Sequence, residues 1–249
     1  MVRKHVDEPK KDGPAATVFL DESTAGPFVT VGGMALRTES LPEAAVRLQA
    51  VKASRSVPID ASLHCRLLFH PEGRRKTALK GFPPEEIDRL LINCVAELRS
   101  LGASFFGVWV DREQYPRSLR LFEGEVFQVT EKHLAGILSL PLFIAVEQAL
   151  GPNFSVIYDP DRTPIDWGVA KRQQASHFVR IMENAKPPVS EQDRALLDMA
   201  DVAAYALSHA RLAAKQPGNR KLRRFSGYMN MLSPNVNQLI FDTDRPPAE

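Results

Sequence analysis

The 249-residue sequence predicts an α/β protein in which helices flank both faces of a mixed β-sheet. Three strand-like segments follow one another near the start, which favours an antiparallel meander. Further apolar strand-like segments then alternate with long amphipathic helices, which favours parallel neighbours. The composition, 44% hydrophobic and 25% charged, is that of an ordinary globular domain.

The first third of the chain is rich in strand-like patterns. Residues 17–21 (TVFLD) and 27–36 (PFVTVGGMAL) lie at hairpin distance, with a turn expected between Thr24 and Pro27. Helical spacing of Ala and Leu side chains predicts a helix over 41–53. Alternating residues predict a third strand over 58–69 (PIDASLHCRLLF), and glycines and prolines predict a loop over 70–84.

The rest of the chain reads as alternating helices and strands. An apolar stripe predicts a helix beginning at Pro84, for which Gly102 is the expected stop. Ser190 is the expected N-cap of the last helix. The further elements expected are a strand over 104–111, a helix over 131–150, a strand over 153–159, a helix over 165–182 and a helix over 191–214.

Three regions are expected along the chain. Residues 1–16 are polar and predict a disordered N-terminal arm, residues 17–214 the folded domain, and residues 215–249 a basic C-terminal extension. The polar start excludes an ordinary signal peptide, and we see no run of about 18 apolar residues. We therefore expect a soluble, cytoplasmic protein without membrane contact.

Several kinds of chemistry lack their sequence signals. Cys65 and Cys94 form no metal or redox motif, and their apolar surroundings predict buried, reduced thiols. The segment 102–106 (GASFF) lacks the second glycine of a serine-hydrolase elbow. No phosphate-binding glycine loop is present, and Gly32 and Gly33, inside a predicted strand, indicate a bulge or close packing.

Acidic residues follow the predicted strands. Asp21, Asp111 and Asp159 each end one, where sites form in open α/β sheets. Asp198 and Asp201, three residues apart, share one face of the last helix. Clustered carboxylates at about 4 Å repel by roughly 4 kcal/mol, so either some are protonated or a cation lies among them, and oxygen ligands suit Mg²⁺ or Mn²⁺. The alternative is that each acid is a separate, solvated turn or cap residue.

Together, DES (21–23), FVTVGGMAL (28–36) and LLDMADVAAYAL (196–207) resemble the proteins grouped as domain of unknown function 3800. SLHC (62–65) resembles the family's His-containing stretch, and VIYDPDRT (156–163) resembles the acidic end of its last strand. The similarity covers about residues 17–212. Such proteins look related to the RNase H-like fold, which agrees with the order of elements above.

The resemblance implies a metal-dependent nuclease site. Asp21 and Asp201 are its first candidates, with Glu22 beside Asp21 and with Asp111 or Asp159 as the third contributor. Asp198 stands where the family shows Gln, and Ser62 stands where many relatives carry an acid.

Other polar residues have two readings each. His64 is a candidate proton donor to a leaving oxygen, or a partly buried strand histidine. Two basic clusters are candidates for nucleic-acid contacts, or are solvated surface. Their residues are Arg74, Arg75 and Lys76 in the first, and Arg220, Lys221, Arg223 and Arg224, near Phe225 and Tyr228, in the second. Because the net charge is only +2, any such contact must be local.

The leading hypothesis is a Mg²⁺- or Mn²⁺-dependent phosphodiesterase acting on nucleic acid. Its expected metal ligands are Asp21, Asp111, Asp159 and Asp201, and its expected catalytic residues are Asp21, Glu22, His64, Asp159 and Asp201. The competing hypothesis is a non-catalytic nucleic-acid-binding or defence-associated module on the same fold.

Overall fold

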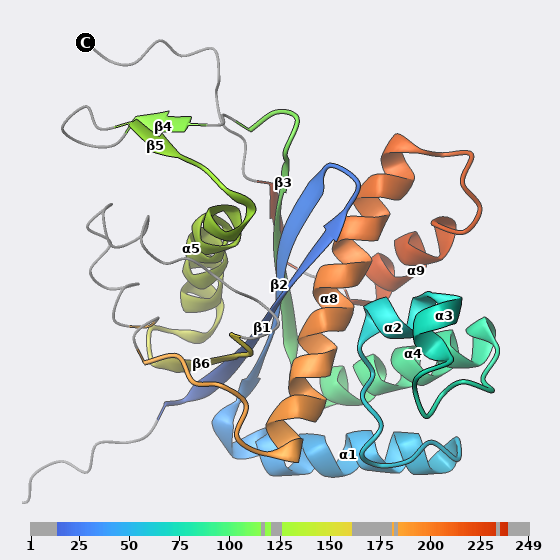
Figure 1. The fold of residues 1–249 in the computed structure, drawn as a ribbon. Coiled ribbons are helices and arrows are strands. Elements are labelled where there is room, and N and C mark those ends of the chain that lie inside the picture. The colour runs from blue at the N-terminus through green and yellow to red at the C-terminus, as the bar shows by residue number, and fades with distance from the viewer. Residues whose placement is uncertain are drawn as a thin grey trace, which may run out of the picture.

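The computed structural model describes residues 14–115, 118–120, 126–160, 181, 184–232 and 235–238. Most of the expected N-terminal arm and almost all of the helix expected over 165–182 lie outside these residues. Within them, a mixed sheet is flanked by helices on both faces, as the sequence predicts (Figure 1).

The main sheet has the strand order β6-β1-β2-β3-β7 among the described residues. Strands β1, β2 and β3 form an antiparallel meander, β6 runs parallel to β1, and β7 runs parallel to β3. The strands are β1 (Ala16–Ala25), β2 (Phe28–Arg37), β3 (Ser104–Asp111), β6 (Phe154–Tyr158) and β7 (Asn235–Gln238). A separate antiparallel pair is formed by β4 (Ser118–Arg120) and β5 (Val126–Gln128).

Helices cover the two faces unequally. One face carries α5 (Glu131–Leu150), whose apolar residues pack on Val18, Leu20 and Phe106. The other face carries the long helix α8 (Glu191–Lys215), which crosses β1 and β2, with the remaining helices beyond it (Figure 1). These are α1 (Leu41–Ser54), after the 3-10 turn Thr38–Ser40, then α2 (Cys65–Phe69), α3 (Pro71–Arg74), α4 (Pro84–Ser100) and α9 (Arg223–Leu232).

Strand β1 does not end at its acids, contrary to the prediction. The ladder with β2 continues past Asp21, which lies opposite Gly32, to the pair of Ala25 and Phe28. The turn itself is Gly26-Pro27, and Gly26 has a positive φ of 59°, which glycine adopts without strain. Asp21 therefore lies within a strand of a long hairpin rather than in a turn.

Glycine brings α8 unusually close to the sheet. A β-carbon on Gly32 would lie 2.4 Å from the backbone nitrogen of Ala204, and one on Gly107 would lie 2.5 Å from the side chain of Leu207. The expectation of close packing at Gly32, against the small alanines of this helix, is confirmed. Thr30 strengthens the contact, since its hydroxyl lies 3.1 Å from the carbonyl oxygen of Ala204.

The predicted strand over 58–69 is wrong. Residues 58–64 have no regular secondary structure, and α2 begins at Cys65. The alternation was misleading because tertiary partners bind this backbone: Lys52 donates to the carbonyl oxygens of Ile59 (3.0 Å) and Ala61 (2.7 Å). The predicted loop after it contains the single turn α3.

The C-terminal region is not a mere extension of the domain. The region assigned to a C-terminal extension includes α9, whose Phe225, Tyr228 and Leu232 are buried in the main core.

The expectation that no long apolar segment is present is wrong. Helix α5 contains an 18-residue window, His133–Leu150, with a mean hydropathy of 1.5, which is long and apolar enough to cross a membrane by length and composition. Half of that window is buried inside the structure, as in the core helix of a folded domain.

Candidate metal centre

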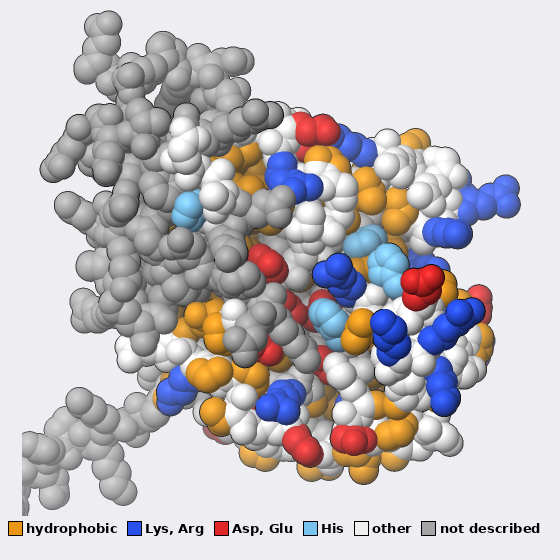
Figure 2. Space-filling view, viewed as in Figure 1, with side chains coloured by type: hydrophobic (Ala, Val, Ile, Leu, Met, Phe, Trp, Pro, Cys, Tyr) orange, Lys and Arg blue, Asp and Glu red, His pale blue; other side chains and the backbone are white. Residues whose placement is uncertain are grey.

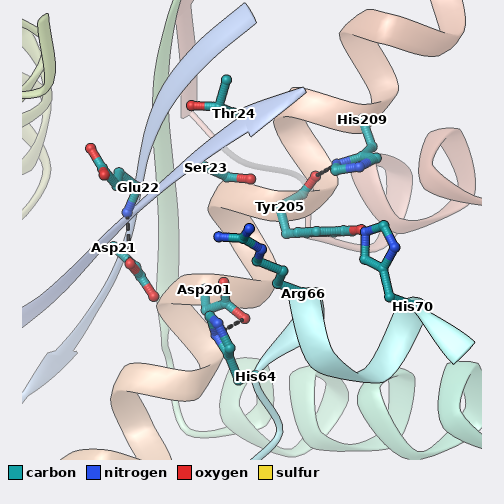
Figure 3. Close-up of a pocket in the computed structure, with 10 residues that line it drawn as sticks. All are labelled: Asp21, Glu22, Ser23, Thr24, His64, Arg66, His70, Asp201, Tyr205 and His209. Atoms are coloured by element: carbon teal, nitrogen blue, oxygen red, sulfur yellow. Dashed lines mark hydrogen bonds and ion pairs between the residues drawn. The ribbon is translucent and has the colours of Figure 1, made fainter. Parts of the chain in front are cut away.

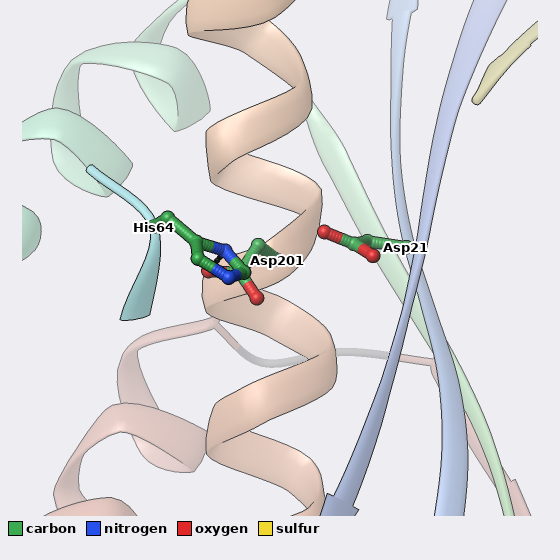
Figure 4. Close-up of side chains that lie close together, drawn as sticks. All are labelled: Asp21, His64 and Asp201. Atoms are coloured by element: carbon green, nitrogen blue, oxygen red, sulfur yellow. Dashed lines mark ion pairs between the residues drawn. The ribbon is translucent and has the colours of Figure 1, made fainter. Parts of the chain in front are cut away.

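Three side chains from distant segments converge beside α8. Asp21 comes from β1, His64 from the residue before α2, and Asp201 from α8 (Figure 4). One potential ligand atom from each lies within 4.8 Å of the other two. Both carboxylates are buried, with Asp21 5% and Asp201 2% exposed, whereas the His64 side chain is partly exposed. This arrangement has the donors to hold a metal ion.

Asp201 orients the histidine as well as facing it. Its Oδ2 accepts a hydrogen bond from the backbone N–H of Cys65 and lies 3.2 Å from His64 Nδ1. The carbonyl oxygen of His64 accepts bonds from the N–H groups of Leu67 and Leu68, each at 3.1 Å, and so begins α2. The histidine is thus fixed between a helix start and a buried carboxylate.

One turn earlier on α8, Asp198 holds the same loop. Its carboxylate accepts from the backbone N–H of Leu63 at 2.7 Å and from the Ser62 hydroxyl at 3.2 Å. Lys52 of α1 is buried, which lowers its pKa, and it binds the same loop by donating a hydrogen bond to the carbonyl oxygen of Ala61. Asp198, predicted to share a face with Asp201, therefore binds the segment that carries His64.

The alternation of β1 sends its two adjacent acids in different directions. Asp21 lies on the face of Phe19, which packs under α8, whereas Glu22 has the parity of Leu20, which packs under α5. Figure 3 shows Glu22 on the other side of β1 from Asp201. Asp21 Oδ1 accepts the backbone N–H of Glu22 at 2.8 Å. Asp21 thus faces the centre, whereas Glu22 lines the pocket but does not belong to the group of three.

The donor set fits a divalent ion in spacing and chemistry. Two ligand atoms on opposite sides of such an ion lie about 4.2 Å apart, since each bond is about 2.1 Å long. The 4.8 Å spacing here needs little closure. A ring nitrogen in addition to two carboxylates suits Mn²⁺ or Zn²⁺ better than Mg²⁺, which prefers oxygen ligands.

Asp159 and Asp111, the two other acids predicted at strand ends, lie in different surroundings. Asp159 directly follows Tyr158, the partner of Leu20 in the parallel pair, so it is one strand away from Asp21. Asp111 lies opposite Phe28 at the far end of β3 and forms an ion pair with Lys215 at 2.9 Å. Neither belongs to the Asp21–His64–Asp201 group, and Asp111 lies level with the hairpin turn, whereas Asp21 lies in the middle of β1.

A cavity of about 600 Å³ contains this centre and brings in residues that the sequence did not single out as site residues. They are Thr24, Arg66, His70, Tyr205 and His209, and Ser23 also lines the cavity (Figure 3). One signal for them was present: Asp201, Tyr205 and His209 are spaced by four residues, which places them on one face of a helix. The others depend on the fold of α2 and α3.

His209 has a fixed orientation. Its ring stacks on Tyr205 with centroids 3.8 Å apart, and its Nδ1 lies 2.9 Å from the carbonyl oxygen of Tyr205. Burial lowers the pKa of His209 below its usual value of 6.5 and raises that of Tyr205. Because a carbonyl only accepts, Nδ1 carries the proton in the neutral ring, and Nε2 carries the lone pair.

The first predicted basic cluster lies at the end of α3, which directly follows α2, and the second lies before and at the start of α9. Helices α2 and α9 are in contact: the ring centroids of Phe69 and Phe225 are 5.3 Å apart, and Arg224 lies 5.4 Å above the Phe69 ring. Figure 2 shows histidine and basic side chains gathered beside acidic ones on this face. Arg224 is partly engaged by Asp88 at 3.6 Å, whereas Arg75, Lys76, Arg220 and Lys221 are exposed.

The thiols are as expected, since Cys65 and Cys94 are free and buried. Burial raises the pKa of both, to about 12 for Cys94, so neither is a ready metal ligand or nucleophile.

Comparisons of the chain with protein-family models, curated proteins and solved structures found no significant match.

Proposed function

We propose that this protein is a divalent-metal-dependent phosphodiesterase that acts on nucleic acid and is built on an RNase H-like core. The observation that carries the proposal is the convergence of Asp21, His64 and Asp201, from three distant segments, in one cavity. Two buried carboxylates at this spacing repel each other, and a bound cation relieves that repulsion.

The strand arrangement supports the fold part of the proposal. The meander β1–β2–β3 is followed by β6, parallel to β1, and the acids lie on the first strand and on the long helix α8. That is the placement implied by the resemblance to domain of unknown function 3800, which motivates a nuclease.

Each residue of the centre has a distinct role in this proposal. Asp21 and Asp201 hold the ion through carboxylate oxygens, and His64 through a ring nitrogen. A divalent ion in this place supplies Lewis acidity and lowers the pKa of water. Asp159, one strand away from Asp21, is the proposed further acid, and Glu22, which lines the cavity, supports Asp21.

Nucleic acid is the proposed substrate because basic residues lie beside the cavity. Arg74, Arg75 and Lys76 follow α2, and the cluster of Arg220, Lys221, Arg223 and Arg224 lies across the Phe69–Phe225 contact. Phosphate contacts by such residues release counterions, so we expect binding to weaken steeply as the salt concentration rises.

The test is cleavage of labelled DNA and RNA with Mg²⁺ or Mn²⁺. Because the ion contributes several kcal/mol to transition-state stabilisation, Asp21→Asn and Asp201→Asn are expected to lower the rate at least about 100-fold. Asp60→Asn, which changes an exposed carboxylate outside the centre, is the matched control and should stay within about twofold of wild type.

Metal binding is measured separately by calorimetry. We expect Mn²⁺ to bind more tightly than Mg²⁺, and His64→Gln to remove more of the Mn²⁺ affinity than of the Mg²⁺ affinity. Cleavage unchanged in Asp21→Asn would refute the assignment. Nucleic-acid binding without divalent binding at millimolar ion would favour the non-catalytic module instead.

A further inference from the structure

The cavity is lined by two chemically different sets of residues. Asp21 comes from β1 and Asp201 from α8, His70 and His209 lie toward the end of α2 and the C-terminal half of α8, and the Arg66 side chain reaches from α2 into the space between them (Figure 3). The metal centre makes no use of Arg66, His70 or His209. They are the nitrogen-bearing groups of the cavity apart from His64.

Arg66 is held differently from other arginines of the protein. Arg47, Arg55 and Arg89 each pair with a glutamate at 2.6 to 3.0 Å. Within the described part of the chain, the Arg66 side chain makes neither a hydrogen bond nor an ion pair, and it extends from α2 toward β1 in the middle of the cavity (Figure 3). Arg66 is exposed, so its donors face solvent, and an anion that enters the cavity can take the place of that solvent.

His70 and His209 approach the same space from other directions. His70 lies four residues after Arg66, beyond the end of α2, and is exposed. His209 is fixed between Tyr205 and Phe225, whose ring centroid is 4.9 Å from its own. With Nδ1 committed to the Tyr205 carbonyl oxygen, Nε2 is the nitrogen that His209 can offer a ligand.

We propose that Arg66 and His70 form a phosphate-binding subsite, with His209 Nε2 accepting a hydrogen bond from a hydroxyl group of the same ligand. The ligand is a phosphate ester about the size of a nucleotide. Arg66 supplies paired N–H donors to the phosphate oxygens, and His70 supplies a donor from a second direction. This inference rests on the proposed function, because it places the substrate's phosphate next to the metal centre.

The size of the cavity supports a nucleotide-sized ligand. Its volume of about 600 Å³ lies in the range of cavities that enclose small ligands. The two sets of lining residues have different roles: the carboxylates hold a cation, and the guanidinium of Arg66 attracts the anionic phosphate. Base stacking on Tyr205 is not proposed, because Phe69 and His209 both stack on that ring.

The subsite is tested without metal. Inorganic phosphate, acetate and nucleoside 5′-monophosphates are titrated into the full chain in the presence of a chelator, and binding is followed by NMR of the histidine rings and by calorimetry. We expect phosphate to bind more tightly than acetate, and the nucleotides more tightly than phosphate. Arg66→Gln is expected to weaken phosphate binding about tenfold, the usual effect of losing a charged hydrogen bond.

Arg75→Gln is the matched control, because it removes an exposed positive charge that does not line the cavity. Its phosphate affinity should stay within about twofold of wild type, since Arg75, unlike Arg66, lies outside the cavity. His70→Gln should weaken binding less than Arg66→Gln. Equal losses in Arg66→Gln and Arg75→Gln, or no phosphate binding at all, would overturn the subsite.

The outcome is separable from that of the proposed function. A protein that binds phosphate through Arg66 but cleaves no nucleic acid retains the subsite and loses the nuclease assignment. A protein that cleaves DNA or RNA in an Asp21-dependent way, with Arg66→Gln unchanged in phosphate binding, retains the nuclease and loses the subsite.

Discussion

Gly32 of β2 lies so close to Ala204 of α8 that a β-carbon on the glycine would come within 2.4 Å of the alanine's backbone nitrogen. Asp21 lies opposite Gly32 in the β1–β2 ladder, and Asp201 precedes Ala204 by less than one helical turn. The separation of the two carboxylates is therefore set by this helix–sheet contact.

Gly32→Ala is expected to destabilise the protein by about 2 kcal/mol or more, because the added methyl group meets backbone that cannot rotate away. The urea midpoint measures this, and calorimetry should show weaker Mn²⁺ binding as Asp201 moves from Asp21. Gly81→Ala, where a β-carbon meets nothing within 4 Å, should change stability by no more than about 0.5 kcal/mol. Equal effects of the two substitutions would contradict the role of the close approach.

Asp198→Ala is expected to lower stability by about 1 to 3 kcal/mol, since it leaves the buried N–H of Leu63 without its acceptor. Because that loop carries His64, Mn²⁺ affinity should fall as well. Ser62→Ala removes only a bond from an exposed hydroxyl and should cost less than about 1 kcal/mol. Urea unfolding and metal titration of both variants are the measurements; full metal affinity in Asp198→Ala would show that the loop holds its shape unaided.

Asp111→Asn should leave metal binding within about twofold of wild type, because Asp111 pairs with Lys215 away from the centre. The lost ion pair is expected to change stability only slightly, because the lysine is exposed to solvent. The Mn²⁺ titration compares it with Asp159→Asn, which should weaken binding if Asp159 is the further acid. Loss of Mn²⁺ affinity in Asp111→Asn alone would restore the strand-end prediction for that residue.

The lowered pKa of His209 gives stability a pH dependence. Between that lowered pKa and 6.5 the unfolded chain binds a proton that the folded chain does not, so stability rises with pH across this window and is fully gained above it. His209→Gln should therefore flatten the increase in unfolding free energy with pH below 6.5. Parallel profiles for wild type and His209→Gln would refute the assignment.

Local patterns were sufficient for most helices. The apolar stripe predicted the helix that runs from Pro84 to Ser100, and the Ser190 cap predicted the start of α8, where Ser190 and Asp193 form a capping box. Gly102 and Gly151 end helices at positive φ values of 83° and 85°. These features depend on residues within one or two turns of each other, so the sequence alone contains them.

Local patterns failed where distant residues bind the backbone. The alternation in 58–69 predicted a strand, but Lys52, Asp198 and Asp201 take the hydrogen-bonding groups that a sheet would need. Likewise, the acids after an apolar run indicated that the strand ends at Asp21, although the pairing with β2 extends it to Ala25. In both cases the deciding bonds join residues far apart in the chain.

The sequence by itself determined the candidate residues: Asp21, His64 and Asp201 stand out, as do Asp111 and Asp159, as acids and a histidine beside apolar segments. Only the tertiary structure decided that these three meet, that Asp111 is bound elsewhere, and that Arg66 shares their cavity. The reason is physical. Side-chain type and helical spacing are local properties, whereas a separation of a few ångströms between β1, α2 and α8 depends on how closely a helix packs against a sheet at Gly32.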